Sequence, residues 1–165
     1  MEQPQTAPSP RRPRVPPGDF ARSFEAAFAK FQVAVETAYA AEPDWPLQAA
    51  AAIRAVLEFA AEDPIAAQTL TVDSLAQGTG HFAHRRPVER LAGLLAPGRD
   101  AHPEGEALPN LLEDALAGGI FMLMVQRFEV GDAGTLTALI PDAIEFALTP
   151  YVGRDRARDV AAARS

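Results

Sequence analysis

The stretch that decides the fold is PNLLEDALAGGIFMLMVQRF, residues 109–128. Its apolar residues lie on nearly every side of a helical wheel, as Leu111, Ile120 and Met122 illustrate. A single neighbouring layer cannot cover such a helix, so the pattern indicates burial on more than one side. We therefore expect 109–128 to be a central helix that packs inside the chain and also against a partner.

The segments on either side have the three-and-four spacing of amphipathic helices, and none alternates as a strand would. Asp63 is predicted to cap a helix that has Pro64 at its first position. Pro141 is predicted to kink the last helix or to bend its end. Together the segments predict an all-α helical bundle of about six helices. The expected helices cover about residues 19–41, 46–62, 64–77, 87–95, 109–128 and 133–148.

Two flanking segments differ in composition from residues 19–153, which we assign to one helical ligand-binding and dimerisation domain. Residues 1–18 are rich in proline and arginine, and their only large apolar side chains are Met1 and Val15. Such a segment cannot form a core, so we expect a disordered tail. Residues 154–165 are predicted to form a frayed helical C-terminal tail.

The composition excludes several classes of protein. The 165 residues include no cysteine, which excludes disulfides and cysteine-ligated zinc. Residues 19–153 carry nineteen acidic and eight basic side chains, a net charge of −11, which disfavours direct binding to nucleic acid. The uncharged run 115–126 is too short to span a bilayer, which needs about 20 residues. We expect a cytoplasmic protein, and fourteen arginines against one lysine point to a GC-rich bacterial genome.

No catalytic constellation is found, so we expect neither enzyme activity nor a cofactor. The sequence has no phosphate-binding loop, no nucleophile elbow and no Glu-x-x-His pair. His81 and His84 can share one helix face, but two arginines follow them and would repel a cation, so no metal site is expected. Glu113 and Asp114 diverge by about 100° on a helix and are predicted to be helix-end charges.

Small residues in the central stretch suggest close contact between helices. Ala115 and Gly119 are four residues apart, and a glycine inside a helix costs about 1 kcal/mol unless close packing offsets it. The helix expected at 133–148 has apolar residues at matching spacing. Two such helices from each of two chains would make a four-helix homodimer interface. The predicted interface residues are Leu112, Ala115, Gly119, Leu136, Ile140, Ala143 and Ile144.

A second cluster, of aromatic and sulfur side chains, is spread over the expected helices. Such residues are more often core than pocket, yet ligand sites in helical proteins are mostly apolar and lie between helices. We expect a pocket for a small hydrophobic effector, with Arg127 or His81 as its polar contact. The predicted lining residues are Phe59, His81, Phe82, Phe121, Met122 and Arg127.

The order of these features resembles the C-terminal half of TetR-family transcriptional regulators. The resemblance covers about residues 19–158. It rests on the turn Glu62-Asp63-Pro64, the pair Leu108-Pro109, the run Ala117–Ile120 and the ending Leu148–Gly153. It implies an all-helical domain that binds a small lipophilic effector inside and dimerises through its last two long helices. Those helices would be 109–128 and 133–148.

One feature of the family is missing from the sequence. Only residues 1–18 precede the resembling part, and they are too few for the three-helix DNA-binding half. We therefore expect no direct binding of DNA by this chain, whether a DNA-binding half was lost or lies upstream. A ligand-free interaction protein that pairs with a complete regulator is the alternative, and an unrecognised enzyme is the least favoured reading.

Overall fold

The computed structural model describes residues 17–76 and 81–163, and every regular element in these two ranges is helical. The predicted all-α fold is confirmed. No helix in the described ranges has the length and apolar character needed to cross a membrane. The first half contains α1 (Pro17–Ala40), α2 (Trp45–Glu62), α3 (Pro64–Gln68), the π-helical turn η1 (Thr69–Asp73) and α4 (Ser74–Ala76). The second half contains α5 (His81–Leu95), α6 (Gly98–Ala101), η2 (Gly105–Ala107), α7 (Leu112–Glu129), η3 (Ala133–Leu139), α8 (Ile140–Val152) and α9 (Arg154–Ala162).

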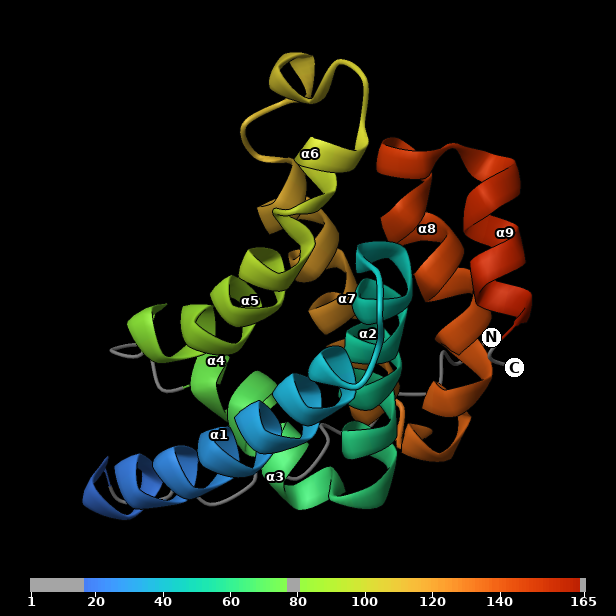
Figure 1. Ribbon diagram of the computed structural model, residues 1–165. Helices are drawn as coiled ribbons and strands as arrows, with labels where there is room; N and C mark the ends of the chain where they lie inside the picture. The colour runs from blue at the N-terminus through green and yellow to red at the C-terminus, as the bar shows by residue number, and fades with distance from the viewer. Residues whose placement is uncertain (1–16, 77–80, 164–165) are drawn as a thin grey trace, which may run out of the picture.

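Helix α2 is at the centre of the arrangement. In Figure 1 α1 crosses it on one side, while α8 and α9 lie on the other. α5 and α7 pack together, and the segment with α6 and η2 projects at one end of the molecule (Figure 1). This arrangement puts α2 in contact with α1, η3, α8 and α5, so its apolar face, from Ala49 to Ala60, is covered by the chain itself.

Aromatic rings fill the space between α1, α2 and α7. Phenylalanines recur along α1 at intervals of three and four residues. Phe20 is tilted against Phe24, and the rings from Phe24 to Phe31 stack on one another. The last of them, Phe31, is fully buried and meets Phe59 of α2 and Phe121 of α7, with both ring centroids 5.9 Å away. Edge-to-face pairs at this distance are a favoured aromatic geometry, so these rings form a filled core.

Two helix starts follow from capping aspartates. The Asp44 carboxylate accepts a hydrogen bond from the Leu47 amide at 3.2 Å and starts α2. The Asp63 carboxylate accepts from the Ala66 amide at 3.1 Å, with Pro64 at the first position of α3. The predicted Asp63-Pro64 start is therefore confirmed.

Other predicted boundaries are wrong at the prolines. α5 begins at His81 and contains Pro87 in its interior, although Pro87 was expected to start the helix. The kink expected at Pro141 is absent, because residues 133–139 form the separate 3-10 helix η3 and Pro141 lies in the first turn of α8. A proline has no amide hydrogen to donate, and the first turn of a helix requires none.

The C-terminal segment also differs from the prediction. Residues 154–162 form α9, which lies alongside α8 and buries Ala157, Val160 and Ala161. The segment is part of the folded domain rather than a frayed tail, so the domain extends beyond residue 153.

Candidate pairing surface

Helix α7 has an inner side and an outer side. The inner side is buried and consists of Leu116, Ala117, Ile120, Phe121, Met124, Val125 and Phe128. The outer side carries Ala115, Gly118, Gly119, Met122 and Leu123, of which Met122 is 47% exposed and Leu123 is 36% exposed. No charged residue occurs between Asp114 and Arg127. An exposed helix side without any charge is unusual for a protein surface, which makes this side of α7 a candidate contact site.

Phe146 of α8 extends this surface. Its side chain is 51% exposed, and a methyl group placed on Gly119 would lie 3.5 Å from the Phe146 ring. The ring therefore lies over the glycine, while Gly118 has open space beside it. We call the outer side of α7 together with Phe146 the pairing surface.

A groove of about 790 Å³ opens beside the pairing surface, between α7, α8 and α9. Its lining combines apolar residues with two acidic and two basic residues, and we call these four charged residues the rim. The lining residues are Leu112, Leu116, Asp142, Glu145, Phe146, Thr149, Pro150, Arg154 and Arg158.

The charges on the groove rim are concentrated around one carboxylate. Glu145 accepts hydrogen bonds from Arg154 Nε at 3.0 Å and from Arg158 Nε at 3.1 Å, both on the same oxygen. The hydrogen bond from Arg154 is the main cause that lowers the pKa of Glu145, and Arg158 adds to it. Glu145 is thus an anion held between two arginines.

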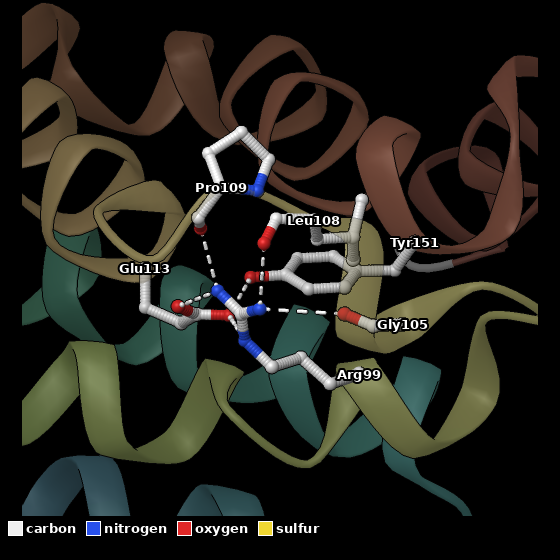
Figure 2. A network of polar contacts seen from close by, with 6 residues as sticks. All are labelled: Arg99, Gly105, Leu108, Pro109, Glu113 and Tyr151. Carbon is white, nitrogen blue, oxygen red and sulfur yellow. Dashed lines mark hydrogen bonds and ion pairs between the residues drawn. The ribbon is translucent and has the colours of Figure 1, made fainter.

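A polar network fixes the start of α7 against the end of α8 (Figure 2). Arg99 of α6 binds Glu113 of α7 with two parallel hydrogen bonds, each 2.8 Å long. The same guanidinium donates to the carbonyl oxygens of Gly105, Leu108 and Pro109, and the Tyr151 hydroxyl donates to Glu113 at 3.0 Å. Arg99 therefore connects the segment before α7 to α7 itself and, through Glu113, to Tyr151 of α8. We call Arg99, Glu113 and Tyr151 the clamp.

Burial and hydrogen bonding act together on the ionisable groups of this network. Burial raises the pKa of Glu113, but hydrogen bonds from Arg99 and Tyr151 and the charge of Arg99 outweigh it, so the pKa is lowered. Burial, and then the bond to Glu113, raise the pKa of Tyr151 above its usual range. Tyr151 therefore stays neutral and Glu113 stays charged, which fits a structural clamp.

Trp45 connects the clamp to α5. Its ring meets the Tyr151 ring edge-on at 5.1 Å, and its indole nitrogen donates to the Leu94 carbonyl at 3.2 Å. A side chain on Gly98 would overlap the Trp45 ring, so glycine is required there. No sequence pattern predicts this network, because residues 45, 99, 113 and 151 are far apart along the chain.

The predicted pocket residues that the structure describes lie in three different places. Phe59 and Phe121 pack on Phe31 in the core, whereas Met122 points away from them on the outer side of α7. Arg127 forms an ion pair with Asp132 at 3.7 Å. The side chains of His81 and Phe82 lie outside the described part of the structure.

The predicted interface needs a correction. Leu136 and Ile144 are 0% exposed and Ile140 and Ala143 are also buried, because α2 covers η3 and α8 within the same chain. A buried side chain has no surface to offer a partner, so these four residues belong to the core. The other three predicted residues, Leu112, Ala115 and Gly119, keep accessible surface on α7.

No cluster of three or more potential metal ligands occurs among the side chains that the structure describes, which do not include those of His81 and His84. Comparison with protein-family models, curated proteins and solved structures finds no match for this chain.

Proposed function

We propose that this chain is a helical sensing and pairing module of the kind found in TetR-family regulators. It pairs with a second copy through the pairing surface, responds to a small apolar effector and does not itself bind DNA. The observation that carries the proposal is the uncharged, exposed side of α7 next to the half-exposed ring of Phe146. A cytoplasmic, bacterial setting is part of the same proposal.

Electrostatics favours this surface for contact between two copies. Each chain has a net charge of −7, so two copies repel each other over most of their surfaces. The run 115–126 contains no charge, and apolar area removed from water contributes about 25 cal/mol per Å². Contact at the outer side of α7 would therefore bury apolar area without burying a charge of the run 115–126.

The effector part of the proposal rests on the resemblance and on the accessible groove between α7, α8 and α9. The ring packing around Phe31 counts against a pocket at Phe59 and Phe121. That filled core favours the second candidate, a ligand-free protein that uses the same surface to pair with a complete regulator.

A pair of glycine substitutions tests the pairing. Gly118→Arg adds a charge to the pairing surface, and its Cβ would meet no described atom from outside the surrounding turns of α7 within 4 Å, so the fold should tolerate it. Gly93→Arg is the matched control, since Gly93 is exposed on α5 and also has open space around it. Light scattering after gel filtration should give a dimer for the wild type and for Gly93→Arg, and a monomer for Gly118→Arg. Equal masses for the two variants would refute the assignment of this surface.

The two candidate functions differ in their response to ligands. A sensing module should melt at a higher temperature in the presence of some members of a broad set of hydrophobic compounds. A ligand-free pairing protein should show no such shift. It should instead capture a full-length helical regulator through the pairing surface, and Gly118→Arg should abolish that capture.

A further inference from the structure

The groove continues directly from the pairing surface. Phe146 belongs to both, with its ring over Gly119 on one side and lining the groove on the other. A second copy that covers the outer side of α7 therefore reaches the groove rim as well. The charges on that rim must then be satisfied across the contact, because charges buried without partners are costly.

Positive and negative charge are separated along the groove. Arg154 and Arg158 share the single carboxylate of Glu145, which leaves one positive charge in excess at that end. Asp142 lies one helical turn before Glu145, is exposed and makes no ion pair within the described residues. The rim therefore has a negative end at Asp142 and a positive end at Arg154.

Two-fold symmetry makes such a rim complementary to itself. In a two-fold symmetric pair, if residue i of one copy contacts residue j of the other, then residue j of the first copy contacts residue i of the second. If two α8 helices cross antiparallel at Phe146, residue 142 of one copy lies opposite residue 150 of the other. Arg154 folds back over this region, because its Nε reaches Glu145 while Thr149 and Pro150 line the same groove. The negative end of each rim then meets the positive end of the other.

We propose that two copies pair antiparallel along α8, crossing at Phe146, with Asp142 of each copy forming an ion pair with Arg154 of the other. The inference rests on the proposed pairing function and adds to it the register and the charges that select it. Ion pairs at the edge of an interface mainly fix register and exclude wrong partners. Here they would make the chain select its own copy.

Charge reversal on each side tests this register. Asp142→Arg and Arg154→Asp each place like charges opposite one another in the self-pair, and each should weaken self-association by about tenfold or more at low salt. A mixture of the two variants should restore pairing, because Arg at 142 then faces Asp at 154 in one contact and the native pair remains in the other. Sedimentation equilibrium of each variant and of the mixture measures this directly.

Matched controls come from α9. Asp155, like Asp142, is an exposed aspartate in the first turn of a helix, and Arg156 is exposed beside Arg154, yet neither lines the groove. Asp155→Arg and Arg156→Asp should leave self-association within about twofold of the wild type, since rim charges without a partner contribute little. Loss of pairing in these controls as well would mean that net charge, not register, controls association, and would overturn the inference.

The other outcomes separate the register from the proposed function. If the mixture pairs no better than either variant alone, the register is wrong. If the wild type pairs, Gly118→Arg abolishes pairing and both reversals have no effect, the pairing function stands and only the register falls. A monomeric wild type overturns both. If octanol dissociates the pair while both reversals have no effect, the groove holds a small apolar molecule and the register is wrong.

Discussion

The two sides of α7 are built from the same kinds of residue but have different surroundings. Ile120, Phe121 and Met124 on the inner side are covered by the chain, whereas Gly118 and Met122 on the outer side face solvent. Apolar composition does not by itself separate a core from a contact surface. What separates them is whether another element of the same chain lies opposite. Among the described residues, a side chain placed at Gly118 would meet nothing within 4 Å, and one placed at Gly119 would meet only the Phe146 ring.

The largest expected effect comes from placing an aspartate on the inner side of α7 and, in a separate variant, on its outer side. Phe121 is 1% exposed and Met122, the next residue, is 47% exposed. Phe121→Asp should prevent folding, because an unpaired charge in the core costs several kcal/mol, a large part of the stability of a domain this size. Met122→Asp should fold normally but should not dimerise as the wild type does. Circular dichroism reports the fold and light scattering the mass. A folded, dimeric Met122→Asp would contradict the role of the outer side.

A smaller effect is expected where α7 begins. Of the two neighbouring carboxylates there, one is bound by the chain and the other faces solvent. Glu113 is held by Arg99 and Tyr151, whereas Asp114 is exposed. Glu113→Gln should lower the free energy of unfolding by about 2 kcal/mol, the value of hydrogen bonds to a charged group. Asp114→Asn should change it by less than about 0.5 kcal/mol. Urea unfolding measures both, and equal losses would mean that the clamp adds no stability.

The smallest expected effect is a pH dependence caused by Glu113 and Glu145. Each has a pKa lowered below its usual value of 4.5 in the folded chain. A group with a depressed folded pKa stabilises the fold above its unfolded pKa, and that stabilisation is lost as the pH falls through the folded pKa. Stability should therefore decline as the pH falls below about 4.5, with a shallower decline for Glu113→Gln. If the wild type and Glu113→Gln lose stability in parallel as the pH falls, Glu113 is not a cause of the pH dependence.

Local signals in the sequence were sufficient to predict much of the fold. The spacing of apolar residues identified the long helices, and Asp63-Pro64 identified a helix start because capping and proline geometry depend only on neighbouring residues. Pro87 shows where this approach fails. A proline is favoured at a helix start, and the preceding residues carried no stronger signal, so the first turns of α5 were not predicted.

The candidate site was less predictable, because it depends on which elements meet. Apolar spacing in 133–148 marked Leu136 and Ile144 as buried but did not reveal that α2 of the same chain covers them. The Arg99–Glu113–Tyr151 clamp joins three elements distant in sequence, and each of its residues alone is an ordinary surface residue type. Of the predicted interface residues, Leu112, Ala115 and Gly119 keep accessible surface on α7, and their place in an interface stays a prediction.

The central claim is that the outer side of α7 joins two copies, and the mass of the unmodified protein tests it most directly. Sedimentation equilibrium over a concentration series that passes through the micromolar range should show the average mass rising from 17.6 kDa to twice that value. The fit should need only monomer and dimer, because a two-fold contact uses up the surface on both partners. A mass that stays at 17.6 kDa at the highest concentration, or that grows without limit, would contradict the account.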